Sequence, residues 1–326
     1  MTTNNEWLTV NVDELWQESA GVKAMYLSPA DGSRLPEFTP GSHIDVKLGE
    51  KLIRQYSLIN SVDDLNRYQI AVLKEVESRG GSLFVHNSLR QGDTIQISHP
   101  RNHFHLMESD KKAVLFAGGI GVTPILSMAQ SLAASGKPFE LHYFAKSEST
   151  CAFRGAIRES SFADQTTFYF DDRPEDQDKA AIMHSILSRI ETNSPVYVCG
   201  PGGFIDFVIT NFSGAGWQDS AIHREYFVAP ELQESGDSKA FKVQVNSTGE
   251  TYTVGENETI VEVLEANGIE IPVSCEQGIC GTCITRVLEG EPEHHDMFMT
   301  DDEHAKNDQI TACCSRSKSD VLVLDL

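Results

Sequence analysis

Three cysteines crowd into the nine residues CEQGICGTC at 275–283, and two more follow at positions 313 and 314. The spacing C-x4-C-x2-C with a distant further cysteine is typical of plant-type [2Fe–2S] sites, whose irons are held by thiolates. Gly278 and Gly281 allow the loop to curve tightly, with positive φ, and let backbone N–H groups point at the sulfurs. The loop therefore predicts a two-iron cluster held by Cys275, Cys280, Cys283 and one of the two later cysteines.

Two other kinds of site also use clustered cysteines. Zinc ribbons usually pair two C-x2-C knuckles, and this region has one. Disulfides need an oxidising compartment. The start, MTTNNEWLTV, has neither a basic segment nor an apolar run of signal-peptide length, so we expect a cytoplasmic protein. The cluster is the favoured interpretation, and by themselves Cys151 and Cys199 are interpreted as small apolar side chains.

A one-electron cluster needs an electron source, and two segments in the first hundred residues suit a flavin. In Arg54-Gln55-Tyr56-Ser57 an arginine, an aromatic ring and a hydroxyl suit a phosphate, a ring face and a polar ring edge. After Lys74, the segment Gly80-Gly81-Ser82 runs into a helix, whose free N–H groups favour phosphate. Each segment is a weak signal alone, because such residues usually serve packing or the surface.

Two glycine turns follow apolar strands in the middle of the chain. AGGIGVTP (117–124) places Thr123 and Pro124 at the start of a helix, and CGPGG (199–203) follows the strand PVYV. The first departs from G-x-G-x-x-G, and a plain tight turn is its alternative reading. Doubly wound folds bind ligands where such turns share a sheet edge, so the pair predicts a nicotinamide site.

The 326 residues are expected to form three domains. Residues 1–105 carry short alternating strands such as HIDVKL (43–48), with one helix at 82–89, and indicate an antiparallel β-barrel. Residues 106–228 alternate buried strands with helices, as an α/β doubly wound domain does. A linker at 229–240 leads to residues 241–326, where a hairpin and a helix ended by Gly268 precede the cysteine loop.

The chain is strongly acidic, with a formal net charge of −22, which repels nucleic acid and anionic lipid. From residue 240 onward 17 acidic residues face 5 basic ones, a formal charge of −12. That surface serves either solubility or docking of a basic partner. No uninterrupted run of apolar residues approaches the length of a membrane span. His294 and His295 are interpreted as loop residues, because the expected chemistry needs no acid–base group.

The motifs, in this order, resemble the phthalate dioxygenase reductase family, and within it the vanillate O-demethylase type. The segments that carry the resemblance are RQYSL, SRGGS, LFAGGIGVTPI, YVCGPGGF, HREYF, VSCEQGICGTCITRVLEGEP and CCSRSKSDVLVLDL. The resemblance implies an FMN-binding β-barrel, an NAD-binding α/β domain and a C-terminal plant-type ferredoxin domain of α+β (β-grasp) type. It also implies that electrons pass from NADH through FMN and the cluster to a Rieske-type oxygenase for an aromatic acid such as vanillate or phthalate.

Matching motif positions imply roles for individual residues. Ser57, Thr123, Cys199 and Phe227 would position the reacting rings, with Phe227 closing over the flavin. The flavin positions are Arg54, Gln55, Tyr56, Ser57, Ala71, Lys74, Gly80, Gly81 and Ser82. The nicotinamide positions are Gly118, Gly119, Gly121, Gly200 and Pro201. The cluster ligands are Cys275, Cys280, Cys283 and Cys313, which favours Cys313 over Cys314.

The sequence leaves alternatives open for the coenzyme and for the electron acceptor. Asp171, after the strand TTFYF, favours the unphosphorylated ribose of NADH, whereas Lys146 could reach the 2′-phosphate of NADPH. The acceptor could instead be a non-Rieske monooxygenase. A redox-sensing or carrier protein is a further alternative, from a different functional class.

Overall fold

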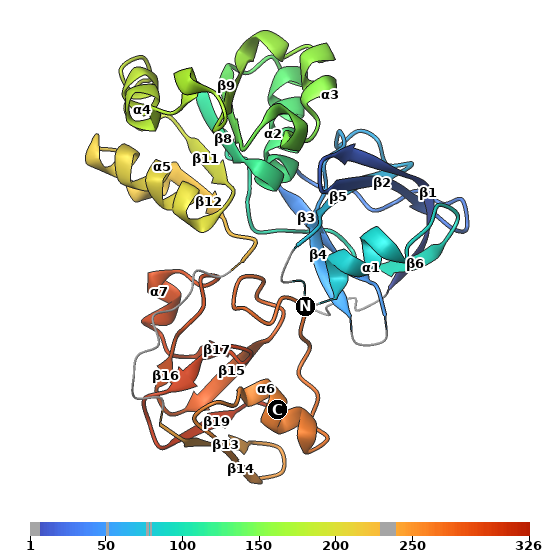
Figure 1. The fold of residues 1–326 in the computed structure, drawn as a ribbon. Helices are drawn as coiled ribbons and strands as arrows, with labels where there is room; N and C mark the ends of the chain where they lie inside the picture. The colour runs from blue at the N-terminus through green and yellow to red at the C-terminus, as the bar shows by residue number, and fades with distance from the viewer. Residues whose placement is uncertain (1–6, 50–51, 76–77, 79, 229–238) are drawn as a thin grey trace. The chain divides into compact units, whose positions relative to one another are not determined.

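The computed structural model describes residues 7–49, 52–75, 78, 80–228 and 239–326 (Figure 1). They belong to two compact units, residues 1–227 and 228–326. In the part of the chain described, no helix is long and apolar enough to cross a membrane. The first unit contains one antiparallel and one parallel sheet, and the second contains a mixed sheet.

The antiparallel sheet has the strand order β4-β3-β6-β1-β2-β5, with β7 paired to β3. Its strands are β1 (Leu8–Ser19), β2 (Val22–Pro29), β3 (Ser42–Lys47), β4 (Ile53–Ser57), β5 (Tyr68–Leu73), β6 (Thr94–Ile97) and β7 (Arg101–Asn102). Just beyond β4, the Ile59 amide donates to the Gln69 carbonyl of β5 at 2.9 Å. The two ends of the sheet therefore meet, as the predicted barrel requires.

The alternating strand predicted at 43–48 is present as β3, and both of its faces are buried. Ile44 and Val46 are buried in the barrel core, but His43 and Asp45 on the opposite face are buried as well. Asp45 is buried because the Arg101 guanidinium reaches its carboxylate at 2.6 Å from β7. The single predicted helix of this region is present as α1 (Gly81–Asn87).

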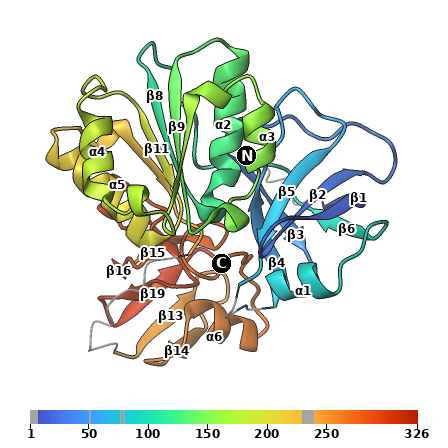
Figure 2. The ribbon, with the colours of Figure 1, turned by 45° about the horizontal axis from the view of Figure 1, so that its top comes forward.

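The second sheet is entirely parallel, in the order β10-β9-β8-β11-β12. Its strands are β8 (Ala113–Gly118), β9 (Phe139–Ala145), β10 (Thr166–Phe170), β11 (Val196–Cys199) and β12 (Ile222–Glu225), and its helices are α2 (Val122–Ala134), α3 (Arg154–Glu159), α4 (Lys179–Leu187) and α5 (Gly202–Gly214). Phe116 packs in one core with residues of α4 and α5, whereas Leu115 packs in another with residues of α2 and α3. Helices therefore cover both faces (Figure 2), which confirms the doubly wound prediction.

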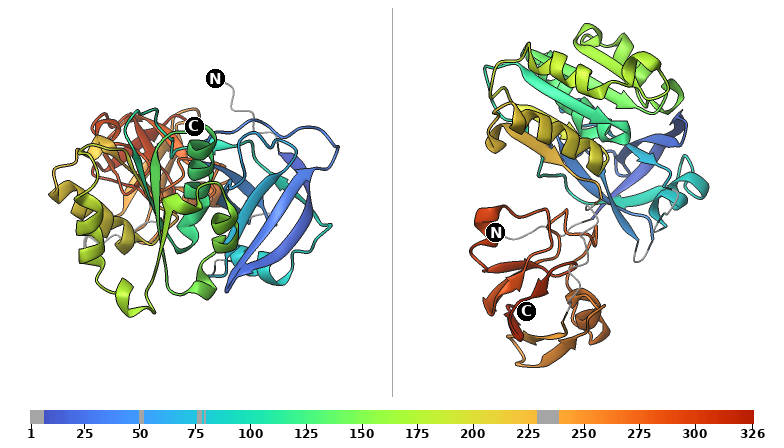
Figure 3. Two further views of the ribbon diagram at one scale, coloured as in Figure 1. Left: turned by 90° about the horizontal axis from the view of Figure 1, so that it is seen from above. Right: turned by 60° about the vertical axis from the view of Figure 1, so that its left-hand side comes forward.

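The barrel and the parallel sheet share one core. Ala24, Ile59 and Ala71 of the barrel region pack in the same buried cluster as Leu115 and Val122. Figure 3 shows the blue barrel strands beside the green helices of this unit. Burial of apolar surface at about 25 cal/mol per Å² makes this shared core a stabilising contact, which holds the two sheets as one unit.

The second unit has the sheet order β14-β13-β19-β15-β17, in which only the β13–β19 pair is parallel, and a small β16–β18 ribbon. Its strands are β13 (Phe241–Val245), β14 (Thr251–Val254), β15 (Ile284–Glu289), β16 (Pro292–Glu293), β17 (Gln309–Thr311), β18 (Arg316–Ser317) and β19 (Val321–Leu324), and its helices are α6 (Ile260–Ala266) and α7 (Asp301–His304). Thr259 and Glu262 form a reciprocal capping box at the start of α6. Gly268, at φ 79°, follows its end, as predicted.

Candidate functional site

The two predicted glycine turns meet at one edge of the parallel sheet. β8 and β11 are neighbours, with Ala117 opposite Cys199, so the turns that follow them lie together. A Cβ on Gly121 would lie 2.3 Å from the Cys199 carbonyl oxygen, and one on Gly200 would lie 2.9 Å from the Gly118 Cα. Only residues without side chains allow this approach, which brings the backbone of both turns to one surface.

Internal hydrogen bonds hold the first turn in shape. It forms a short 3-10 segment, Gly119–Gly121, with Gly119 at φ 54°. The Tyr143 hydroxyl donates to the Gly119 carbonyl at 3.1 Å, and the buried Thr123 hydroxyl donates to the Ile120 carbonyl at 3.0 Å. The Thr123 hydroxyl proton is therefore used within the turn, and its oxygen lone pairs are left as acceptors.

A buried carboxyl group, which the sequence analysis missed, completes this edge. Glu225 lies opposite Cys199 in the β11–β12 pair. Its Oε2 is shielded from solvent and has no hydrogen-bond partner among the residues described. Burial raises the pKa of the Glu225 carboxyl to about 8, and burial also raises the pKa of the Cys199 thiol. The signal was present in the segment HREYF, from which only Phe227 was selected.

Phe227 lies two residues beyond this carboxyl. Its ring is half-buried and packs against the core shared by the barrel and the parallel sheet. Cys199, fully buried, is a member of the same core. Pro201 caps α5, directly after the second turn. The structure thus brings Cys199 and Phe227 to the joint core of the first unit, and it buries Thr123 in α2 next to Val122 of that core.

The flavin segments of the barrel also come together. The Arg54 side chain crosses Gly81 so closely that a Cβ there would meet Arg54 Cγ at 2.5 Å. The arginine therefore lies against the first residue of α1. Gly80, at φ 93°, precedes it. The Ser82 hydroxyl accepts from the Glu75 amide at 3.1 Å and donates to the Ser78 hydroxyl at 2.9 Å, so it joins both residues to the start of α1.

The remaining barrel positions lie on two strands. In β4, Ser57 is buried, and burial raises the pKa of the Tyr56 hydroxyl well above its ordinary value. The Gln55 Nε2 is a buried amide donor without a hydrogen-bond partner among the described residues. Ala71 is buried in β5, and Lys74, just after this strand, is exposed. The Gln55 amide and the Ser57 hydroxyl lie on one face of β4, opposite the face whose Tyr56 ring packs on the barrel core. A buried donor beside a buried hydroxyl fits the polar edge of a flavin ring.

Asp171 lies at the carboxyl end of β10. Its amide donates to the Ala145 carbonyl at the end of β9, and its carboxylate is 2.9 Å from the Lys179 ammonium. Lys146 follows β9 and is exposed. The two residues predicted to select the coenzyme are thus on adjacent strand ends.

The cysteine loop has the predicted curvature. Gly278 and Gly281 have φ values of 72° and 69°, and a Cβ on Gly281 would meet the Phe298 ring at 2.4 Å. The Gln277 amide donates to the Cys275 sulfur at 3.3 Å. Glu276 also has a positive φ of 55°. The loop therefore wraps with N–H groups directed at sulfur, as expected from its glycines.

The thiols of Cys275, Cys280, Cys283 and Cys313 are buried and linked by hydrogen bonds: Cys275 contacts Cys280 and Cys313, and Cys313 also contacts Cys283. Hydrogen bonds from the Cys280 and Cys313 thiols lower the pKa of the Cys275 thiol. The Cys314 thiol also contacts that of Cys313, but its sulfur additionally lies 3.3 Å from the Thr311 hydroxyl and would lie 2.5 Å from a Cβ on Gly278. Four convergent thiols with backbone donors fit a [2Fe–2S] cluster, whose irons require four thiolates.

Comparisons with known proteins agree with this geometry. A family model for the 2Fe-2S iron-sulfur cluster binding domain matches residues 243–318, and one for the oxidoreductase NAD-binding domain matches residues 115–210. The chain is 46% identical over 319 residues to a vanillate O-demethylase oxidoreductase of Acinetobacter baylyi, covering 98% of this chain and 99% of the relative. It belongs to the phthalate dioxygenase reductase family.

Other members of the family strengthen the assignment. A vanillate O-demethylase oxidoreductase from a Pseudomonas strain is 51% identical over 298 residues, which is 91% of this chain and 93% of the relative. The crystal structure of phthalate dioxygenase reductase superposes with a TM-score of 0.75 at 33% identity, covering 99% and 98% of the two chains. The predicted family, fold class and oxidoreductase class are confirmed, and the chain combines a flavin domain, an NAD-binding domain and a [2Fe–2S] domain.

Proposed function

We propose that this chain is the NADH-dependent reductase of a two-component oxygenase of vanillate O-demethylase type, with FMN as its flavin. One observation carries the proposal: a single chain contains a candidate flavin site, a candidate nicotinamide site and a candidate cluster site. These are Arg54 against Gly81, the paired glycine turns and the four-thiol loop, respectively. Relatives named for vanillate demethylation match almost the full length of the chain. The electron acceptor is therefore a Rieske-type oxygenase component that acts on a vanillate-like aromatic acid.

The barrel would hold FMN through its phosphate and its ring. Arg54 supplies a guanidinium beside Gly81, the first residue of α1, a combination that suits a terminal phosphate dianion. Tyr56 offers a partly buried ring, and the unsatisfied Gln55 Nε2 offers a donor. The phosphate ends at these groups in FMN, whereas FAD would carry an adenosine beyond them. Release of the flavin by heat and identification by mass should give FMN.

The edge of the parallel sheet would position the nicotinamide. Gly118, Gly121 and Gly200 let the coenzyme approach backbone N–H groups without steric hindrance. Thr123 offers a hydroxyl oxygen as acceptor, and the buried Glu225 carboxyl offers a proton donor below pH 8. Phe227 would cover the flavin until the nicotinamide replaces it. All six residues act by orienting the nicotinamide and flavin rings, since hydride transfer falls steeply with misalignment.

The four thiolates of the cysteine loop would hold the cluster, and the loop amides would stabilise its negative charge. When bound, FMN accepts the hydride of NADH and the cluster passes the electrons on singly. The residues proposed to bind FMN are in the first unit, and the cluster ligands are in the second. Cys275, Cys280 and Cys283 lie on one loop, and Cys313 follows β17.

The partner is proposed to dock through the acidic second unit. Residues 240–326 carry a formal charge of −12, and Glu276 is exposed within the cysteine loop itself. Complementary charge mainly raises the association rate and is screened by salt. Electron transfer to the oxygenase should therefore slow as ionic strength rises. Glu276→Lys should reproduce the slowing at low salt, whereas Glu159→Lys, on an exposed position of the first unit, should not.

The decisive experiment is reconstitution. The purified chain, its oxygenase component, NADH and vanillate should give demethylated product at a rate that depends on both proteins. Reduction of cytochrome c by NADH, measured in the same preparation, distinguishes an active reductase with another acceptor from a protein that transfers no electrons. Rapid cytochrome c reduction without demethylation would overturn the vanillate assignment, and absence of both would overturn the reductase itself.

A further inference from the structure

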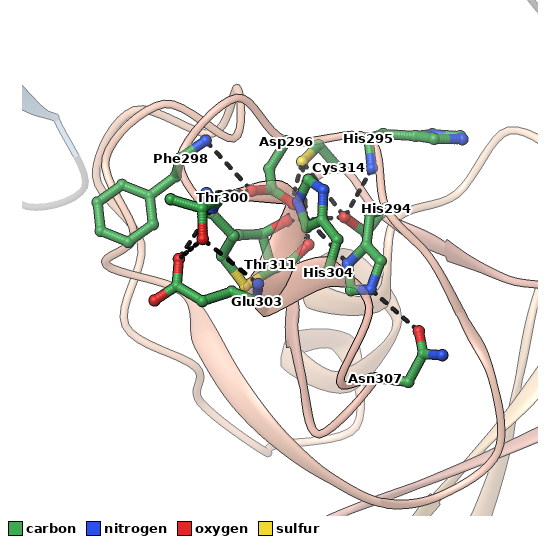
Figure 4. Close-up of polar contacts among 12 residues, drawn as sticks. His294, His295, Asp296, Phe298, Thr300, Glu303, His304, Asn307, Thr311 and Cys314 are labelled. Atoms are coloured by element: carbon green, nitrogen blue, oxygen red, sulfur yellow. Dashed lines mark hydrogen bonds and ion pairs between the residues drawn. The ribbon is translucent and has the colours of Figure 1, made fainter. Parts of the chain in front are cut away.

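Three side chains of the second unit converge outside the cysteine loop. His294 and Asp296 follow β16, and His304 ends α7; one ligand atom from each lies within 4.8 Å of the others (Figure 4). The sequence suggested only loop residues here. The structure instead buries His294 to 10% exposure and Asp296 to 0%, and leaves His304 23% exposed.

The two carboxylate oxygens of Asp296 have different partners. Its Oδ2 accepts the backbone amides of Phe298 at 3.2 Å and Met299 at 2.8 Å, which fixes the carboxylate. Its Oδ1 lies 3.2 Å from His304 Nε2 and 3.9 Å from His294 Nδ1. The backbone hydrogen bonds to Oδ2 therefore hold the carboxylate in place, while Oδ1, which faces the two imidazoles, accepts none of them. Metal-ligating carboxylates are commonly oriented by such hydrogen bonds.

His294 has its tautomer set by Asn307. The Nε2 of His294 lies 3.3 Å from the Asn307 amide oxygen, which can only accept, so Nε2 carries the proton. Nδ1 then presents a lone pair. This atom is buried, faces Asp296 Oδ1, and has no hydrogen-bond partner among the residues described. A buried imidazole whose second nitrogen donates to an amide carbonyl is the arrangement of a metal-bound histidine.

His304 closes the group from the solvent side. Its ring stacks on that of His294 with centroids 4.3 Å apart. Its backbone position is fixed, because the His304 amide donates to the Thr300 carbonyl at 2.9 Å and Thr300 and Glu303 cap each other. The partial exposure of this ring gives an ion a path to the buried carboxylate.

We propose that His294 Nδ1, Asp296 Oδ1 and His304 Nε2 form a binding site for a divalent transition-metal ion such as Zn²⁺, separate from the [2Fe–2S] cluster. Two imidazoles and a carboxylate are a zinc ligand set, with water in the fourth position. Zinc bonds of about 2.0–2.2 Å place tetrahedral ligand atoms about 3.3–3.5 Å apart. Because an imidazole lone pair lies in the plane of its ring, the partly exposed His304 ring would have to rotate out of its stack on His294 to direct Nε2 at the ion.

The ion would join α7 to a segment that contacts the cysteine loop. The Met297 amide, next to Asp296, donates to the Gly278 carbonyl at 3.0 Å. A Cβ on Gly278 would lie 3.0 Å from Asp296 Cα. Cross-linking β16, α7 and the loop between them through one ion should therefore retain the cysteine loop in its cluster-binding shape. The site has a structural role in this proposal, independent of the partner oxygenase.

The test uses the complete protein with its cluster and flavin bound, titrated with ZnCl2 by calorimetry and analysed for zinc and iron after desalting. We expect one zinc per chain while both irons remain, and slower loss of the cluster's visible absorbance on heating. His294→Ala and His304→Ala should each weaken zinc binding more than about 100-fold, and Asn307→Ala about 10- to 100-fold, as loss of an outer partner does.

His295→Ala is the matched control. This neighbouring imidazole lies 3.2 Å from Glu293 and outside the three-ligand group, so its removal should leave zinc binding unchanged. His304→Gln, with an unaltered cluster spectrum as the criterion of folding, replaces the alanine variant if that one misfolds. The proposal is overturned if no stoichiometric zinc binds, if binding survives both histidine substitutions, or if zinc enters only as iron leaves.

Discussion

The buried carboxyl of Glu225 should make the first unit lose stability as pH rises. In the unfolded chain this group titrates near 4.5, whereas burial raises its pKa to about 8 in the folded protein. Below pH 4.5 both states carry the proton. Between 4.5 and 8 the unfolded state ionises first, so the folded state loses stability with each pH unit. Above 8 both states are ionised and the pH dependence ends.

The size of the effect follows from the two pKa values. Each pH unit across this window costs about 1.4 kcal/mol, and the whole window about 5 kcal/mol at most. This is an upper bound, because water entering beside the carboxylate would lower the cost. Glu225→Gln keeps the shape of the side chain and removes the titration. The variant should therefore match the wild type near pH 4.5 and exceed its stability by several kcal/mol at pH 8.5.

Urea unfolding followed by tryptophan fluorescence measures this difference in unfolding free energy without interference from the ferredoxin unit. All three tryptophans, Trp7, Trp16 and Trp217, precede residue 228, so the signal reports the first unit. Each sample contains the same excess of flavin and no nicotinamide. Glu159→Gln, an exposed carboxyl in α3, is the control and should show no comparable trend. A stability difference that is constant between pH 5 and 8.5, or that shrinks as pH rises, would refute the reasoning.

Three further predictions concern the other sites. Cys280→Ser should leave flavin reduction by NADH intact and abolish cytochrome c reduction, measured by stopped-flow absorbance; retained cytochrome c reduction without a cluster would contradict the electron path. Asp171→Asn should raise the ratio of kcat/KM for NADPH over NADH about tenfold by removing a negative charge beside the ribose site, and an unchanged ratio would exclude this role. Gly121→Ala should cost about 3 kcal/mol or more in unfolding free energy, because its Cβ would collide with the Cys199 carbonyl. Gly155→Ala, in open space on α3, should instead stabilise the unit by up to about 1 kcal/mol, and equal effects of the two would refute the steric argument.

Much of the fold was predictable because the local patterns are strong. Alternation of apolar residues indicated the barrel strands, and strand–helix alternation indicated the parallel sheet. The alternation within HIDVKL did not reveal that His43 and Asp45 of β3 are buried. Their burial depends on Arg101, which β7 brings across from a distant part of the chain, and residue order does not reveal such a partner.

The cysteine spacing by itself determined the cluster loop. Three of its four thiols lie within nine residues, so glycine geometry and sequence proximity are sufficient to bring them together. The glycine turns were equally recognisable in the sequence, since each directly follows an apolar strand. What the tertiary structure alone decided is which distant groups face one another: Glu225 against Cys199 across β11 and β12, Arg54 across Gly81, and His304 beside His294 and Asp296. These contacts depend on sheet order and on loop packing, and those are set by the burial of the whole core rather than by any short segment.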